Sequence, residues 1–198
     1  MTIIGITGPT GSGKTTALEV LRGRGYEIVD CDALYYERLR EDQELRNALT
    51  EAFGPVFLPD GSLDRRTLAA RVFGDSGELK RLNAIVFPAM YAAVEQKIKK
   101  CAHKGLAIDA INLIESGMDR LCGLTIAVTA DPAVRARRIM ARDGITQEQA
   151  AQRIAAQKPD RYYRKNCTFV LENRAGSRAE FQQLIEAFFQ DIFLDTEE

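Results

Sequence analysis

Short runs of aliphatic and β-branched residues alternate with longer amphipathic stretches along most of the chain. Short apolar runs of this kind are typical of buried parallel strands, and apolar positions three or four apart are typical of helices. The alternation predicts an α/β fold, in which helices cover both faces of a mostly parallel sheet. The five expected strands are residues 3–7, 26–29, 105–111, 124–129 and 167–171.

Boundary signals mark the ends of the helices between these strands. The first expected helix, residues 15–22, ends at Gly23. Asp131 followed by Pro132 is an N-cap residue before a first-turn proline, which predicts a helix that ends at Gly144.

Two further helices carry capping signals at their amino ends. Thr146 and Gln149 have the spacing of a capping box. Ser177 and Glu180 are expected to cap the final helix. The apolar positions of that helix are Phe181, Leu184, Ile185, Phe188 and Phe189.

The stretch 32–104 is mostly helical in pattern and is too long for a simple crossover helix. Residues 79–100 are expected to form a long helix, kinked or split at Pro88. We therefore expect a single domain over 1–198 with a helical insert at about 32–104, which by analogy with related folds holds the second substrate.

Composition narrows the functional class only slightly. The chain has 198 residues, is 45% hydrophobic, and carries a net charge of −1 with a pI of about 6.0, so we expect neither nucleic-acid nor membrane partners. No charged leader precedes a long apolar run, and no run approaches the length of a membrane span. The four cysteines form no C-x-x-C pair, which indicates reduced thiols and a cytoplasmic protein. We expect a monomer or a small homo-oligomer.

Glycine residues concentrate in the loop after the first strand, which reads "GPTGSGKTT" and fits the phosphate-binding pattern G-x-x-x-x-G-K-[ST]. Glycines let main-chain N–H groups turn toward an anion, and the amino end of the next helix adds to this effect. Lys14 is expected to reach the β- and γ-phosphates of ATP, and the Thr15 hydroxyl to complete a Mg²⁺ shell. The expected ATP-binding residues are Gly8, Pro9, Thr10, Gly11, Ser12, Gly13, Lys14, Thr15 and Thr16.

The rest of the chain favours a small-molecule kinase over other users of this loop. A GTPase would carry an N-K-x-D sequence after a later strand, and none is present. The segment "GLAIDAINLIES", with Asp109 inside the third strand and Glu115 past its end, is an imperfect match to the acidic strand of larger ATPases. The small size of the chain and its arginine-rich segment favour a small-molecule kinase.

Several stretches resemble the dephospho-CoA kinase family nearly end to end. They are "GITGPTGSGKTT", "IVDCDA", "DGSLDRRTLAARVF", "LNAIVFP", "RRIMARDGITQEQAAQRIAAQ" and "LENRAG". The resemblance implies a three-layer P-loop kinase fold with a five-stranded parallel sheet and a helical lid at about 132–165. It also implies transfer of the ATP γ-phosphate to the ribose 3′-hydroxyl of dephospho-CoA, with ATP and Mg²⁺ bound.

The same resemblance implies roles for individual residues. Asp32 matches the family's acceptor-hydroxyl aspartate, which can also reach the metal, although an aspartate there could instead cap a helix. The residues implied for charge stabilisation on a closing lid are Arg138 and Arg142, which share a helix face. The residues implied for substrate or adenine contact are Arg65, Glu115 and Asn173.

Other residues on these segments are expected to contribute less, or nothing, to binding and catalysis. Arg135 and Arg137 are expected to be surface charges, Arg153 is a weaker lid candidate, and Asp30 only supports its loop. Cys31 lies between two aspartates, which should raise its pKa, so we do not expect a nucleophile.

Departures from the family pattern gather on the acceptor side. Phe87 stands where the family commonly has histidine, Tyr36 where it often has arginine, and Asn112 falls within a variant of the segment before Glu115. Two alternatives therefore stay open at this point: a P-loop kinase for another small acceptor, such as a nucleoside or nucleotide, and a nucleotide-binding regulator with little catalysis.

Overall fold

The computed structural model describes residues 1–72 and 74–194 and contains one parallel sheet of five strands in the order β2-β3-β1-β4-β5. This confirms the α/β class and the five-stranded parallel sheet. The strands are β1 (Thr2–Thr7), β2 (Tyr26–Asp30), β3 (Gly105–Asp109), β4 (Leu124–Thr129) and β5 (Phe169–Glu172).

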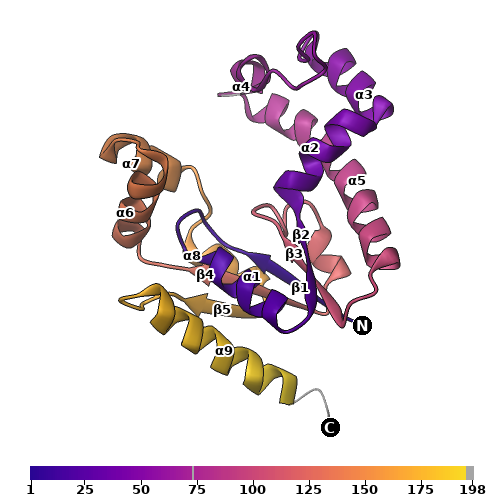
Figure 1. Ribbon diagram of the computed structural model, residues 1–198. Helices are drawn as coiled ribbons and strands as arrows, with labels where there is room; N and C mark the ends of the chain where they lie inside the picture. Colours follow the sequence, from indigo (N-terminus) through magenta and orange to yellow (C-terminus); the bar gives the residue numbers. More distant parts are fainter. Residues whose placement is uncertain (73, 195–198) are drawn as a thin grey trace.

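Helices cover both faces of the sheet, so the protein has three layers (Figure 1). On one face, side chains of β1 and β4 pack with α1 (Lys14–Gly23) and α9 (Arg178–Leu194). On the other face, side chains of β2 and β3 pack with α2 (Cys31–Glu41) and α5 (Ser76–Lys100). The apolar runs of the strands therefore contribute to two cores, as expected for parallel strands.

The chain between β2 and β3 forms an arm of four helices that rises from the sheet (Figure 1). We call it the α2–α5 arm; between its first and last helices lie α3 (Gln43–Phe53) and α4 (Arg65–Val72). The base of the arm, through α2 and α5, joins the core beneath β2 and β3. Its outer part has a core of its own, formed by Leu39, Leu45, Leu49, Phe53, Val56 and Leu68.

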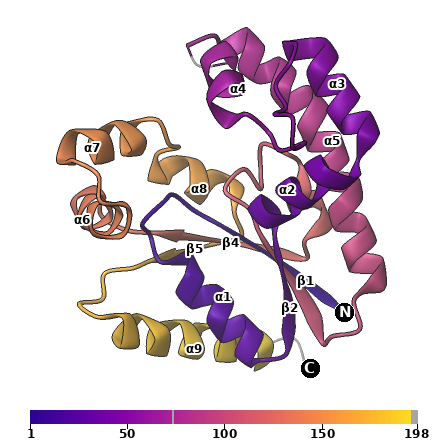
Figure 2. The same ribbon diagram turned by 45° about the horizontal axis from the view of Figure 1, so that its top comes forward.

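A second arm follows β4 and consists of α6 (Pro132–Asp143), α7 (Gln147–Ala155) and α8 (Asp160–Asn166). We call it the α6–α8 arm. Its caps form as the sequence predicts: the Asp131 side chain accepts from two main-chain N–H groups of α6, and Thr146 and Gln149 make a capping box. Figures 1 and 2 show α6 and α7 on one side of the sheet's end and the α2–α5 arm on the other.

Some local predictions differ from the structure. Helix α5 begins at Ser76 and is not divided at Pro88, because Met90, Ala93 and Val94 hold its second half against the sheet. In α9, Leu184 is 55% exposed although its helical spacing predicted an apolar contact. A short 3₁₀ helix, η1 (Met118–Leu121), follows β3 and was not expected.

The helices also bear on the expectation that no segment spans a membrane. Even α5, with 25 residues, carries charged side chains in both its first and its last turns. Within the described residues, no helix has both the length and the apolar character that a transmembrane span requires.

Gly8 allows the loop after β1 to leave the sheet. Its φ is +134°, and a Cβ at this position would lie 2.1 Å from the carbonyl oxygen of Val128 in β4. We expect Gly8→Ala to lower the free energy of unfolding by about 2 kcal/mol or more, because strain and overlap add. Urea unfolding followed by far-UV circular dichroism measures the change.

Gly23→Ala is the matched control, because a Cβ at Gly23 would meet no atom within 4 Å. We expect this variant to stay within about 0.5 kcal/mol of the wild type or to gain slightly. Equal unfolding midpoints for the two variants would contradict the role given to Gly8.

Candidate active site

The loop between β1 and α1 is a phosphate-binding loop in geometry as well as in sequence. Its last residue, Gly13, caps α1 with a φ of +109°, so the helix points its amino end at the loop. A Cβ on Gly13 would lie 2.6 Å from Nδ2 of Asn173, which leaves no room for a side chain. The sequence places glycine where the backbone must be left-handed and closely packed.

Arg135 holds one side of this loop from α6. Its Nε donates to the carbonyl oxygen of Thr10 at 3.0 Å, and the side chain is almost fully buried. Its terminal nitrogen donates to Gln157, whose Nε2 in turn donates to Thr10 Oγ1 at 2.9 Å. Both ends of the α6–α7 hairpin are therefore tied to one loop residue. The expectation that Arg135 is a surface charge is wrong, because its guanidinium is buried beneath the loop. Arg137 is exposed, as expected.

Arg138 and Asn173 hold the next two carbonyl groups. Arg138 NH1 lies 3.2 Å from the oxygen of Gly11 and 3.3 Å from that of Ser12. Asn173 Nδ2 donates to the oxygen of Ser12 at 2.9 Å from the segment after β5. Because a trans peptide directs its N–H opposite to its carbonyl, the N–H groups of Gly11 and Gly13, which follow the Thr10 and Ser12 carbonyls, face away from the donors, whereas the N–H of Ser12 donates to the carbonyl oxygen of Pro9 at 3.3 Å. The loop is thus arranged to receive an anion.

Lys14 is oriented by a carboxylate at the end of β3. Its Nζ lies 2.9 Å from Oδ1 of Asp109, and both side chains are largely buried. Asp109 is in register with Ile6 of β1 and with Asp30 of β2, so three strands end beside the loop. This is the edge at which open parallel sheets bind ligands.

Asp32 stands in the first turn of α2, and Asp30 rather than Asp32 caps that helix. Asp30 Oδ1 accepts from the N–H groups of Asp32 and Ala33 at 2.9 and 3.0 Å. The capping alternative for Asp32 is therefore wrong, and Asp30 does more than support its loop. Burial, followed by the charge of Asp30, raises the pKa of Asp32, while Lys14 opposes the shift.

Two cavities meet at Asp32. The first, which we call the phosphate cleft, has a volume of about 380 Å³ and is bounded by the loop, Asp32 and α6. Its lining residues are Pro9, Thr10, Gly11, Ser12, Gly13, Lys14, Thr15, Asp32, Ile111, Arg138, Ile139 and Arg142. Most of the predicted ATP-binding and catalytic residues therefore lie together.

The second cavity, which we call the arm pocket, has a volume of about 220 Å³ and lies between α2, α5 and the loop after β3. Asp32 and Ile111 line both cavities. Cys31 also lines the pocket, but burial raises the pKa of its thiol to about 12, in keeping with the expectation that it is no nucleophile. The other walls include apolar and aromatic side chains and two side-chain amides, from Tyr35, Asn83, Val86, Phe87, Met90 and Asn112.

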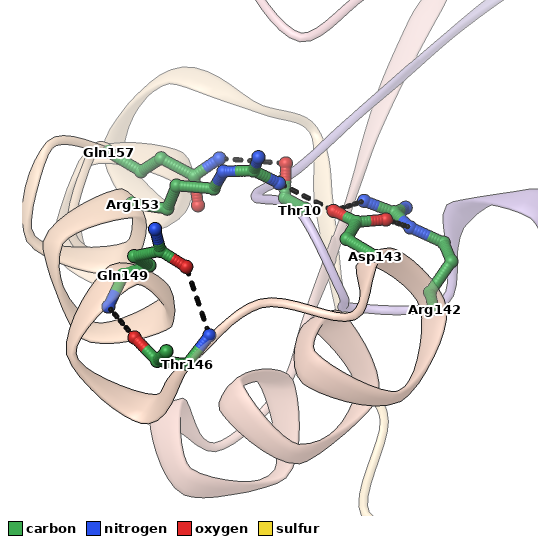
Figure 3. Close-up of polar contacts among 7 residues, drawn as sticks. All are labelled: Thr10, Arg142, Asp143, Thr146, Gln149, Arg153 and Gln157. Carbon is green, nitrogen blue, oxygen red and sulfur yellow. Dashed lines mark hydrogen bonds and ion pairs between the residues drawn. The ribbon is translucent and has the colours of Figure 1, made fainter.

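Arg142 reaches the rim of the phosphate cleft from the last turn of α6 and is paired there with Asp143. Its Nε and NH2 lie 2.6 and 3.0 Å from the two oxygens of Asp143 (Figure 3). Hydrogen bonding from Arg142, with a further contribution from Arg153, lowers the pKa of Asp143 to about 2.

Five of the predicted site residues lie outside the lining of both cavities. Gly8 packs against β4, and Thr16 is buried in α1. Asn173 lies behind the loop, where its Nδ2 holds Ser12 and its Oδ1 is buried without a hydrogen bond among the described residues. The remaining two are Arg65 and Glu115, each of which contacts a side chain of one of the arms.

Arg65 begins α4, and its guanidinium carbon lies 4.1 Å from the centre of the Tyr36 ring. Glu115 follows β3 and lies 3.8 Å from Nζ of Lys158, just beyond α7. Hence Tyr36, which departs from the family pattern, supports an arginine from another helix, and Glu115 joins the sheet to the α6–α8 arm.

Sequence reasoning missed three residues that organise the site: Asp109, Arg135 and Gln157. Asp109 carries a signal, since it ends an apolar run, but that run matches the acidic strand of larger ATPases only imperfectly. Gln157 ends a stretch that resembles the family, but nothing in that stretch predicts its contact, and Arg135 carries no signal, because their partners are a hydroxyl and a main-chain oxygen far away in the sequence.

Together, the loop, its lysine and the shared aspartate define a P-loop kinase that acts on a small acceptor. A family model described as dephospho-CoA kinase matches residues 2–179. A curated dephospho-CoA kinase of Thermus thermophilus is 36% identical over 191 residues, covering 96% of this chain and 91% of the relative. That of Geobacter sulfurreducens is 34% identical over 197 residues, covering 98% and 100%.

Solved structures agree with this match. The crystal structure of TT1252 from Thermus thermophilus superposes with a TM-score of 0.78 at 35% identity, covering 96% of this chain and 97% of that one. A dephospho-CoA kinase from Campylobacter jejuni, with a TM-score of 0.59 at 20% identity and coverage of 96% and 97%, shares the fold. The chain belongs to the dephospho-CoA kinase family, whose activity is the ATP-dependent phosphorylation of dephospho-CoA to coenzyme A.

Replacing the buried arginine tests how the loop is held. We expect Arg135→Met to lower the free energy of unfolding by about 2 kcal/mol or more, because the Thr10 carbonyl and Gln157 lose their donor. We also expect weaker binding of an ATP analogue. Urea unfolding and calorimetric titration measure the two effects.

Arg137→Met removes the same charge from an exposed position on the same helix and should change stability by less than about 0.5 kcal/mol. If both variants behave alike, Arg135 does not hold the loop.

Proposed function

We propose that Asp32 accepts the proton of the ribose 3′-hydroxyl of dephospho-CoA while the γ-phosphate of ATP is transferred to that oxygen. The observation that carries this assignment is that Asp32 lines both the phosphate cleft and the arm pocket. A carboxylate at such a junction can contact a donor phosphate and an acceptor hydroxyl at the same time.

The phosphate cleft suits the triphosphate of ATP. The loop presents main-chain N–H groups, Lys14 adds a cation held by Asp109, and Arg138 and Arg142 lie on the opposite wall. Lys14 and the N–H groups stabilise charge that develops on the β–γ bridging oxygen, and the two arginines stabilise charge on the transferred group.

The arm pocket suits the adenosine end of the acceptor. The ribose that carries the 3′-hydroxyl also carries adenine, so the base must lie close to Asp32. Tyr35, Phe87 and Met90 offer an apolar surface for a flat ring, and side-chain amides in the pocket can pair with its edge. Phe87, where the family commonly has histidine, fits this use as a ring contact.

The transfer then proceeds in line. The acceptor oxygen forms a bond to the γ-phosphorus while the bond from that phosphorus to the bridging oxygen breaks. The hydroxyl proton passes to the carboxylate of Asp32, and the electron pair of the broken bond stays on ADP beside Lys14. Burial and Asp30 raise the pKa of Asp32, which improves it as a base.

The oxygen donors beside the loop fit a magnesium ion shared with the nucleotide. Thr15 offers an exposed hydroxyl and Asp32 a carboxylate in the same cleft. Within the described residues, no group of three or more acidic, histidine or cysteine side chains forms a complete metal cage. Two oxygen donors suit a Mg²⁺ ion that is held by few protein ligands and otherwise by substrate phosphates. An ion held in this way would neutralise phosphate charge.

We infer that the α6–α8 arm acts as the lid predicted over about 132–165, and the α2–α5 arm as the acceptor insert predicted over about 32–104. The lid assignment is supported by the arginines that the arm places over the cleft. Adenine contact by Asn173 remains a prediction, and it requires the buried Oδ1 to become accessible. Arg65 remains a candidate for an acceptor phosphate, and Glu115 for an acceptor contact.

Three broader assignments also remain predictions. A cytoplasmic location is supported by four cysteines that are all free. The absence of nucleic-acid and membrane partners rests on the near-neutral charge of the chain. A monomer or small homo-oligomer is an expectation of its own.

A coupled assay with ATP, Mg²⁺ and dephospho-CoA tests the proposal. We expect turnover by the wild type, and a decrease in kcat of roughly 10²- to 10³-fold for Asp32→Asn, because the base is lost. Calorimetric titration with an ATP analogue in the absence of Mg²⁺ should give a Kd within about twofold of the wild type, because the loop and Lys14, which hold the phosphates, are unchanged.

Coenzyme A itself is the matched acceptor control, because its 3′-oxygen is already phosphorylated, and it should give no turnover. Undiminished kcat in Asp32→Asn would remove the proposed role. Faster turnover of a free nucleoside than of dephospho-CoA would point to another acceptor.

The pH profile gives a second test. Asp32 must be ionised to accept a proton, so kcat/KM should fall as pH decreases through its pKa. Because that pKa is raised above 3.8, the fall should begin at a higher pH than for an ordinary aspartate. Rates from about pH 4 to pH 8 measure the profile. The same acidic fall in Asp32→Asn would assign it to another group.

A further inference from the structure

Arg142 is paired with a carboxylate at the rim of the cleft in which it would serve phosphate transfer. It lines the phosphate cleft, but both its Nε and NH2 are engaged by the carboxylate of Asp143, and its side chain is 62% exposed. A bidentate pair of this kind uses the Nε and NH2 face of the guanidinium, which is one of the two faces that can bind a phosphate through two hydrogen bonds. Contact with the γ-phosphate through that face requires Arg142 to leave Asp143, and contact through NH1 would share its charge between the two anions.

Asp143 has a second cationic partner from the next helix. NH1 of Arg153 in α7 donates to Oδ2 of Asp143, while Arg142 belongs to α6 (Figure 3). One carboxylate thus joins two guanidinium groups across the bend of the arm. Gln157, four residues after Arg153, is hydrogen-bonded to Thr10, so this end of the arm is fixed to the loop.

We propose that Asp143 competes with the γ-phosphate of ATP for Arg142, and that Arg153 keeps Asp143 neutralised when Arg142 turns to the phosphate. Asp143 and Arg153 are positioning residues that act through Arg142. This inference rests on the proposed contact between Arg142 and the γ-phosphate.

The charges explain why both partners are needed. If Arg142 left a carboxylate with no other partner, that negative charge would lie beside the triphosphate and oppose its binding. Because Arg153 remains on Asp143, the exchange leaves one ion pair intact and frees one arginine. An exposed ion pair contributes little free energy, so Arg142 can exchange Asp143 for the phosphate. The expected changes in ATP affinity are therefore small, but each variant has a defined direction of change.

A purely structural role for Asp143 predicts the opposite sign. If Asp143 only oriented Arg142 toward the nucleotide, its removal would weaken ATP binding. If Asp143 competes with the phosphate, its removal strengthens binding. The direction of the change therefore separates the two roles.

Calorimetric titration of the full chain with a non-hydrolysable ATP analogue and Mg²⁺ tests the proposal. We expect Asp143→Asn to lower the Kd by about two- to fivefold, because Arg142 is released. Arg153→Gln should raise the Kd by a similar factor, because Asp143 then holds Arg142 alone. The same titration with an ADP analogue should show neither change, since the γ-phosphate is absent.

Glu148→Gln is the matched control: it removes one negative charge from an exposed site on α7, and no ion pair of the described residues includes Glu148. Its Kd should stay at the wild-type value. In an Arg142→Ala background, Asp143→Asn should have no effect.

A higher or unchanged Kd for Asp143→Asn would overturn the inference, and so would a gain that persists without Arg142. If Arg142→Ala alone binds the ATP analogue as the wild type does, Arg142 makes no contact with the bound γ-phosphate and the inference fails at its premise; only an undiminished kcat in that variant would remove the proposed role of Arg142 in transfer. These two failures are distinguishable, because the second concerns a single variant with Asp143 intact.

Discussion

Hydrogen bonds to the carbonyl groups of residues 10–12 are the constraint on which the site depends. Their donors, Arg135, Arg138 and Asn173, come from segments more than a hundred residues further along the chain. Because these donors engage the carbonyls, the loop can turn N–H groups toward a triphosphate without rearranging when it binds. Preorganised dipoles of this kind are the main means by which phosphoryl-transfer sites stabilise charge.

The fold brings this loop beside the acceptor site through its topology. Strands β2 and β4 lie on opposite sides of β1, so the helical segments that follow them flank the loop after β1. The α2–α5 arm rises on one side and the α6–α8 arm on the other (Figure 2). Asp32 begins one arm and the arginines of α6 belong to the other. Closing the distance between the arms would enclose the reacting groups and exclude water.

Patterns within the chain were enough to predict the sheet, the loop and most helix ends, because these depend on local spacing and capping. Asp32 was found through its place after a strand and through family resemblance. The supporting contacts were not predictable in the same way. Arg135 looks like any other arginine on a helix, and only the packing of α6 against the loop makes it a buried donor. Likewise, the backbone geometry at the start of α2 decides that Asp30, and not Asp32, caps this helix.

A crystal structure with a non-hydrolysable ATP analogue, Mg²⁺ and dephospho-CoA tests the central claim most directly. The account predicts that the ribose 3′-oxygen lies within hydrogen-bonding distance of the Asp32 carboxylate and in line with the γ-phosphorus, which is held by the loop and Lys14. A 3′-oxygen bound away from Asp32, or a triphosphate outside the loop, would contradict it.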